Sequence, residues 1–162
     1  MADIKIKLPN GESKSIPKGS KVEDLLPDLG IKPEEALAAK VNGRMVDVYY
    51  PLEKDTELEV IQSNTEEGLD ILRHTTAHVM AHAVLRIFKD VEFAIGPTIE
   101  DGFYYDFDLT ETLSPEHYET IENEMHRIVN EDIPIQRIEM TKAEAHKKLE
   151  EQKAKFKIEL LN

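Results

Sequence analysis

Three histidines stand at intervals of four residues in the stretch LRHTTAHVMAHAVLRIF, which runs from Leu72 to Phe88. This spacing places His74, His78 and His82 on one side of an α-helix, because each residue turns a helix by about 100°. Imidazole has a pKa near neutrality, so such a stripe could accept protons in catalysis or bind a metal ion. The spacing alone is more typical of ordinary helix packing than of a functional site, so the surrounding residues must decide.

The neighbours of the histidines predict where this stripe lies. One face of the helix would carry Leu72, Thr76, Val79, Met80, Ala83 and Ile87, and the histidines would share the opposite face with Ile71 and Leu85. A helix that is apolar on two sides is packed on two sides, so we expect the histidines to line an interior cleft. A zinc site is disfavoured, because the chain has no cysteine and the segment lacks the glutamate of the HExxH motif. His117, His126 and His146 are interpreted as solvated surface residues.

Composition excludes several classes of site and partner. The chain has 162 residues, of which 40% are hydrophobic, enough to fill the core of one ordinary domain or two small ones. It has no thiolate nucleophile and no disulfide, since cysteine is absent. No apolar run approaches the roughly 20 residues that span a bilayer, so we expect a cytoplasmic protein without membrane contact. The net charge of −13 argues against strong non-specific binding of nucleic acid, so any contact with RNA must be local or use charge from elsewhere.

The elements before Ser63 predict a small β-grasp-like domain, residues 1–63. Ile4–Leu8 alternates as a strand, and after a turn GESKSIP returns as the second strand of a hairpin. Ser20–Glu23 has the spacing of a capping box that opens a short helix through Leu26. Further short strands are predicted at Ala39–Val41, Arg44–Val46 and Leu58–Ile61, with a tight turn at Asn42-Gly43.

Residues 64–162 predict a second α+β domain, in which a long central helix packs on an antiparallel sheet. The long helix is Glu66–Phe88, and FAIGPTIEDGFYYDFDL follows as a hairpin around Asp101-Gly102. Ser114-Pro115 begins another helix, and Thr141–Glu144 is a capping box for the next. Asp132–Met140 and KFKIELL (155–161) look strand-like. The predicted buried stripe of the helix after Ser114 is Tyr118, Ile121, Met125, Ile128 and Val129.

The two halves resemble successive parts of one enzyme family. HTTAHVMAHAVLRIF and FAIGPTIEDGFYYDFDL resemble the start of the editing domain of bacterial threonyl-tRNA synthetases, which are class II aminoacyl-tRNA synthetases. EEGLDILRH resembles their junction with an N-terminal TGS domain, and IKLPNGESKSI, KVNGRMVD and TELEVI resemble that TGS domain. Alanyl-tRNA synthetases share the His-x-x-x-His motif but have no TGS domain in front of it. The resemblance therefore implies an N-terminal region of threonine–tRNA ligase.

This resemblance implies that the second domain hydrolyses serine mistakenly esterified to the threonine tRNA. His74 and His78 match the helix histidines that position or deprotonate water and hold the terminal adenosine. Tyr105 matches a residue near the substrate, and Lys157 matches a lysine implicated in catalysis as a positive group near the ester. From the sequence alone, Tyr105 could equally be a half-buried hairpin aromatic, and without the resemblance Lys157 would be interpreted as a strand lysine that points to water. His82 is interpreted as a packing residue.

The resemblance also implies partners and cofactors. The partner would be the acceptor end of threonine tRNA. The parent enzyme would be a homodimer that takes part in translation. No cofactor is expected for these residues, whereas ATP, magnesium and zinc are implied for the aminoacylation core that this chain lacks. An Asp and a Cys-x-x-x-His element complete the editing site of the family beyond the position of Asn162. We therefore expect the chain to be an N-terminal portion that is at best a weak hydrolase by itself.

Two other functions fit the same sequence. The chain could be a non-catalytic regulatory module in which a TGS domain and a degenerate editing-like domain bind RNA or a protein partner. Against that, His74, His78 and Lys157 are all present. It could also be a free-standing hydrolase that acts on mischarged tRNA in trans, but such an enzyme would need the complete site.

Overall fold

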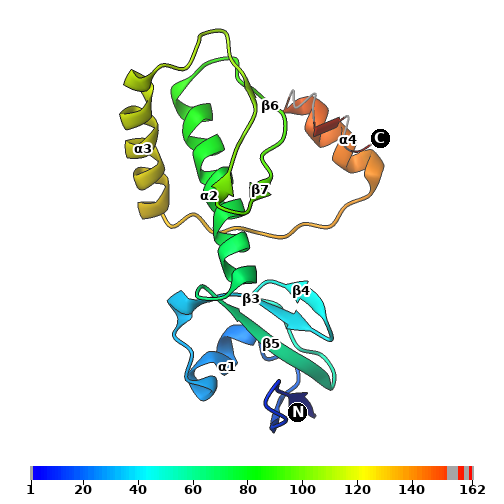
Figure 1. The fold of residues 1–162 in the computed structure, drawn as a ribbon. Coiled ribbons are helices and arrows are strands. Elements are labelled where there is room, and N and C mark those ends of the chain that lie inside the picture. Colours follow the sequence, from blue (N-terminus) through cyan, green and yellow to red (C-terminus); the bar gives the residue numbers. More distant parts are fainter. Residues whose placement is uncertain (1, 153–156, 159–160, 162) are drawn as a thin grey trace. The chain divides into compact units, whose positions relative to one another are not determined.

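The computed structural model describes residues 2–152, 157, 158 and 161 (Figure 1). The chain divides into two compact units, residues 1–72 and residues 73–162. The division falls within helix α2 (Glu66–Ile87), so this helix contributes residues to both units. Within the part of the chain that the structure describes, no helix is long and apolar enough to cross a membrane.

The first unit is built on a five-stranded mixed sheet with the strand order β2-β1-β5-β3-β4. The strands are β1 (Asp3–Lys7), β2 (Ser13–Pro17), β3 (Ala36–Val41), β4 (Arg44–Val46) and β5 (Thr56–Gln62). Only β1 and β5 run parallel, and the other neighbouring pairs are antiparallel. Helix α1 (Val22–Leu29) and the short 3-10 helix η1 (Pro33–Glu35) connect β2 to β3. The predicted β-grasp arrangement and the α+β class are therefore confirmed.

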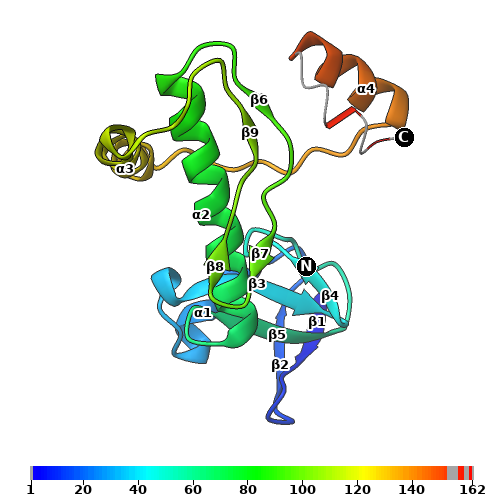
Figure 2. The same ribbon diagram turned by 45° about the horizontal axis from the view of Figure 1, so that its top comes forward.

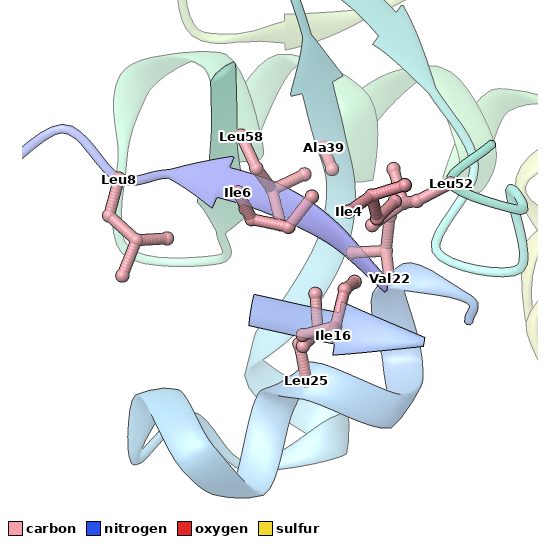
Figure 3. Packing of buried hydrophobic residues seen from close by; sticks show 9 residues of the cluster. All are labelled: Ile4, Ile6, Leu8, Ile16, Val22, Leu25, Ala39, Leu52 and Leu58. Carbon is pink, nitrogen blue, oxygen red and sulfur yellow. The ribbon is translucent and has the colours of Figure 1, made fainter. Parts of the chain in front are cut away.

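The core of this unit joins alternate strand residues to one face of α1 (Figure 3). Ile4 and Ile6 of β1 are buried whereas Lys5 between them is exposed, as the period of two in a strand requires. Val22 and Leu25, three residues apart on α1, face this layer. The complete buried cluster is Ile4, Ile6, Leu8, Ile16, Val22, Leu25, Ala39, Leu52 and Leu58. Each large aliphatic side chain buried here contributes roughly 1.5–3 kcal/mol.

Helix α1 begins one residue later than the Ser20–Glu23 pattern predicts. The N-cap residue is Lys21, and its backbone N–H donates to Oδ2 of Asp24 at 2.8 Å. The Ser20 hydroxyl donates instead to the carbonyl oxygen of Pro17 at 2.7 Å. The predicted cap was wrong because Asp24, next to Glu23, supplies the carboxylate at the third helical position. The helix also continues to Leu29, where Gly30 in the left-handed region ends it.

The Asn42-Gly43 turn between β3 and β4 is confirmed. Both residues have positive φ angles, 51° and 79°, which is the backbone of a two-residue type I′ hairpin turn. The side chain of Asn42 also accepts a hydrogen bond from the backbone N–H of Glu57 at 2.8 Å. The turn therefore fixes the register of β3 with β4 and is anchored to β5.

The second unit combines helices with one long hairpin. Strands β6 (Glu92–Phe93) and β9 (Phe107–Asp108) pair at one end, and β7 (Thr98–Ile99) and β8 (Gly102–Phe103) pair at the tip, as Figure 2 shows. Helix α3 (Pro115–Asn130) follows, and α4 (Lys142–Glu151) comes after an irregular segment. Small and apolar residues of α2 meet α3 and the hairpin in a cluster that includes Ala83, Val84, Phe88, Ile121 and Ile128.

Two details of this unit differ from the sequence predictions. The hairpin pairs Ile99 with Gly102, so its two turn residues are Glu100 and Asp101 and not Asp101-Gly102. On α3, Ile121 and Ile128 are buried as predicted, but Tyr118 and Val129 are 61% and 63% exposed. Residues 121 and 128 are two helical turns apart, and Met125 between them is half-buried and packs against the same cluster, as predicted. The wider predicted stripe was therefore wrong at its edges.

The two strand-like segments near the C-terminus are not strands in the described residues. Asp132–Met140 is irregular, and Ile135 is 78% exposed, because no described strand pairs with this segment. In KFKIELL, Lys157, Ile158 and Leu161 have helical backbone, while Phe156 and Leu160 lie outside the described residues. Ile158 and Leu161 are half-buried and three residues apart, a spacing that also suits a helix. The capping box at Thr141 is confirmed, with the Glu144 N–H donating to the Thr141 hydroxyl at 3.3 Å.

Candidate functional site

Helix α2 brings two of the predicted site histidines into direct contact. Nε2 of His74 lies 3.0 Å from Nε2 of His78, and the two rings meet edge to face with centroids 4.6 Å apart. One ring must donate this hydrogen bond and the other accept it, so the two rings hold complementary protonation states. The contact follows from the spacing of four residues, which stacks side chains one helical turn apart.

The predicted interior cleft holds only in part, because His78 and His82 line a pocket but the stripe is not enclosed. His74 and His78 are exposed and His82 is half-buried. Within the second unit, the buried residues of α2 are Ala77, Ala81, Ala83 and Val84. Ala77 and Ala81 each come one residue before a histidine and thus lie about 100° around the helix from it. The histidines therefore lie beside the buried side of α2 and not within it.

Tyr105 joins the histidine pair from the hairpin. Its ring centroid lies 6.4 Å from that of His78, in an edge-to-face arrangement. Tyr105 also stacks on Phe107, with ring centroids 5.1 Å apart, and packs edge to face against Phe93, with ring centroids 6.0 Å apart. A methyl group on Gly96 would lie 2.1 Å from Cδ2 of Tyr105, so the absence of a side chain at residue 96 makes room for the ring. The hairpin therefore holds Tyr105 beside His78 by packing.

Lys157 acts on the same site through its charge. Although much of the His78 side chain is exposed, partial desolvation of its ring lowers its pKa, and the positive charges of His74 and Lys157 lower it further. Burial raises the pKa of the Tyr105 hydroxyl, so this group stays protonated well above neutral pH. Three of the four predicted site residues, His74, His78 and Tyr105, are thus in ring contact in the second unit, and the fourth, Lys157, acts on His78 through its charge. His78 is kept neutral at pH 7, which leaves it able to accept a proton.

Sequence reasoning missed an ionic cluster next to this site. Nε of Arg86 donates to Nε2 of His82 at 3.2 Å. The guanidinium also donates to both carboxylate oxygens of Glu131 at 2.6 and 2.8 Å and to Glu124 at 3.1 Å. These carboxylates raise the pKa of Arg86, and Arg86 in turn lowers the pKa of Glu131. The spacing of four between His82 and Arg86 was the available signal, whereas the partners on α3 could not be read from the sequence.

His78 and His82 both line a pocket of about 270 Å³. Thr75 and Asp132 add polar groups, and the remaining lining is aliphatic: Val79, Ile128, Val129, Ile133 and Ile135. A mostly apolar pocket with a few polar groups is the usual form of a small-molecule site. The interpretation of His82 as a packing residue is therefore incomplete, because its ring is hydrogen-bonded and reaches this pocket.

The other three histidines have different surroundings. His126 is exposed, as predicted. His117 is half-buried: its Nδ1 accepts the Ser114 N–H at 3.0 Å, and its ring packs on Phe88 at 5.3 Å. His146 is half-buried and lies 3.4 Å from Glu150. The surface interpretation was wrong for His117, which caps helix α3.

Among the described residues, no three histidine, cysteine, aspartate or glutamate side chains are grouped so that they could hold a metal ion. A second pocket, of about 380 Å³, lies in the first unit and is lined by both acidic and basic residues, among them Lys7, Lys40, Glu57 and Glu59. Lys7 is paired with Glu57 at 3.1 Å, and Lys40 lies 4.0 Å from Glu59. The charges around this pocket are thus largely compensated.

Comparison with known proteins shows what the chain is similar to. Residues 4–62 match the TGS domain. Over 160 residues the chain is 45% identical to the threonine–tRNA ligase of Desulforamulus reducens, covering 98% of this chain and 25% of that protein. It is 44% identical to the threonine–tRNA ligase of Bacillus velezensis and 42% identical to threonine–tRNA ligase 1 of Bacillus subtilis, with the same coverage. The chain thus spans about a quarter of the length of these curated relatives. It contains a TGS domain, and along nearly its whole length it is similar to the N-terminal portion of bacterial threonine–tRNA ligases.

Proposed function

We propose that the chain acts as the N-terminal region of a threonine–tRNA ligase and that its second unit hydrolyses serine wrongly esterified to threonine tRNA. The observation that carries the proposal is the 3.0 Å contact between His74 and His78, with Tyr105 and Lys157 beside it. The similarity of the chain to threonine–tRNA ligases supports this proposal. A synthetase for threonine needs such a step, because one missing methyl group discriminates by only about 1–3 kcal/mol.

The proposed reaction is attack of water on the ester carbonyl carbon. The water oxygen bonds to that carbon, one water proton passes to an imidazole, and the bond to the ribose oxygen breaks while that oxygen takes up a proton. Both Nε2 atoms are used in the histidine pair. The ring that donates through Nε2 therefore carries an unprotonated Nδ1, and this atom is the proposed proton acceptor. The lowered pKa of His78 favours the neutral form of this ring.

Two further groups would stabilise the charge that develops on the carbonyl oxygen. The ammonium of Lys157 is close enough to His78 to lower its pKa, so its charge also reaches a substrate bound there. The Tyr105 hydroxyl is a hydrogen-bond donor at neutral pH, since the ordinary pKa of tyrosine is about 10 and burial raises it further. We propose that these groups hold the ester and that the terminal adenosine lies against the histidine helix.

The proposed partner is the acceptor end of threonine tRNA in the cytoplasm. With a net charge of −13, the chain would bind tRNA through local basic groups such as Lys157 or through the remaining parts of the ligase. Aminoacylation itself, with ATP, magnesium and zinc, is proposed for the three quarters of the relatives' length that this chain does not cover. A homodimeric ligase is proposed on the same basis.

The test is deacylation of serine-charged threonine tRNA. The chain is compared with a version extended through the Cys-x-x-x-His element that the family resemblance predicts, and His74→Ala is introduced into each. His126→Ala is the matched control, since it removes an exposed histidine from α3. We expect the extended version to hydrolyse the ester, and His74→Ala to reduce the rate at least about 100-fold while His126→Ala leaves it unchanged.

An inert extended version would refute the editing proposal. If that protein still bound the tRNA, the non-catalytic binding module would replace the hydrolase as the proposed function. Activity in the chain by itself would instead favour a hydrolase that acts in trans.

A further inference from the structure

Arg86 determines which ring nitrogen of neutral His82 carries the proton. A guanidinium donates hydrogen bonds and never accepts them, so Nε2 of His82, 3.2 Å from Nε of Arg86, must be the unprotonated nitrogen. In the neutral ring the proton then resides on Nδ1. Nothing in the helix itself requires this tautomer, because the choice is made by the neighbouring side chain.

The arginine is itself held from a second helix. Glu131, the C-cap residue of α3, accepts two hydrogen bonds in the forked geometry that suits a guanidinium, and Glu124 accepts a third. Glu124 lies seven residues earlier on the same face of α3, and its second oxygen accepts from Arg127 at 3.0 Å. With three further hydrogen bonds to these two carboxylates, Arg86 has little freedom to rotate away from His82.

His82 also reaches the pocket that His78 lines. The lining there is mainly aliphatic, so each polar group has a large influence on the orientation of a bound molecule. His82 lines this pocket with its tautomer set by Arg86, so its N–H donor stays on Nδ1. A histidine free to exchange tautomers would carry its donor there only part of the time.

We propose that His82 binds the substrate of the editing site through its Nδ1–H and that Arg86, clamped by Glu131 and Glu124, is the positioning residue that holds this tautomer. The inference rests on the proposed function, since it assigns His82 to the same substrate as His78. The ligand class is an aminoacyl ester of adenosine, and His82 would donate to one of its acceptor oxygens.

The first test reads the tautomer directly. Nitrogen-15 NMR of the chain distinguishes a protonated Nδ1 from a protonated Nε2, and we expect His82 to carry its proton on Nδ1. Arg86→Met should release the ring to a mixture of tautomers. Arg127→Ala is the control, because it removes an arginine from Glu124 without touching His82. A wild-type signal from protonated Nε2 would overturn the inference.

The second test uses a non-hydrolysable amide analogue of seryl-adenosine and the extended version. Asparagine places its amide where Nδ1 stands, whereas glutamine places it where Nε2 stands. We expect His82→Asn to bind the analogue within about threefold of wild type and His82→Gln and Arg86→Met to bind about tenfold more weakly, the effect of one hydrogen bond. A merely structural role would not separate the two amides.

The outcomes distinguish the two proposals. Binding by the wild type with equal affinities for the Asn and Gln variants overturns the role of His82 and leaves the editing proposal standing. No binding of the analogue by the wild type, together with an inert extended version, overturns the editing proposal and the role of His82 with it.

Discussion

Gly96 is the residue at which the site is most sensitive to one added methyl group. A Cβ at this position would lie 2.1, 2.5 and 2.7 Å from three ring carbons of Tyr105. Its φ angle is outside the left-handed region, so alanine is compatible with the backbone and only the ring contact opposes it. Gly96→Ala therefore perturbs the packing of Tyr105 and little else.

The size of the effect follows from the geometry. Carbon atoms in van der Waals contact are about 3.5–4.0 Å apart, so the ring or the loop must move by roughly 1.5 Å. Such overpacking costs about 1–3 kcal/mol, partly offset by the roughly 0.4–1 kcal/mol that Gly→Ala gains through the unfolded state. We expect a net loss of about 1–2 kcal/mol in the free energy of unfolding of the second unit. A displacement near 1 Å at the site would also slow the proposed hydrolysis about 100-fold.

Gly102→Ala provides the matched control in the same hairpin. No atom lies within 4 Å of a Cβ at that position, and its φ is also outside the left-handed region. This variant should therefore gain only the roughly 0.4–1 kcal/mol that comes from restricting the unfolded chain. Denaturant unfolding measures the two stabilities, and nuclear Overhauser contacts between Tyr105 and His78 report the ring position. Equal stability of the two variants, with the contact between Tyr105 and His78 retained, would refute the reasoning.

Three further predictions concern other residues. Gly68→Ala should destabilise the first unit by about 1–3 kcal/mol in thermal unfolding, because its Cβ would lie 1.9 Å from the backbone oxygen of Gln62; an unchanged Tm would contradict this. Because the folded-state pKa of His78 lies below its ordinary 6.5, the unfolded state binds more protons as the pH falls through 6.5. Stability should therefore be full above that pH and decrease below it, and His78→Gln should show a smaller decrease in parallel denaturation curves. Thr141→Val should cost about 1 kcal/mol by removing the cap of α4; loss of helical circular dichroism measures it, and Thr110→Val is the control.

The sequence predicted those features that depend on neighbouring residues. The Asn42-Gly43 turn needs two residues that tolerate positive φ, and the chain supplies them side by side. The contact between His74 and His78 follows from the helical repeat, and the Thr141 cap follows from its box. Local chemistry was sufficient for each of them.

Features that depend on distant partners were mispredicted or missed. Asp132–Met140 alternates like a strand, but pairing requires a neighbour, and no described strand supplies one. Whether Val129 is buried depends on how wide a stripe α2 covers, which the amphipathic pattern of α3 does not contain. The salt bridge between Glu131 and Arg86 joins residues 45 positions apart. In the sequence, either side chain alone is typical of an ordinary surface charge.

The stacked rings of Tyr105 and Phe107 make the site its own spectroscopic reporter. Their planes are inclined by only 13°, so protons on each ring lie in the shielding region of the other and their resonances shift away from random-coil positions. The chain has no tryptophan and only five tyrosines, so these signals stand in a sparse part of the aromatic spectrum. Any ligand that moves the hairpin changes the ring currents, and its binding can be followed without attaching a label.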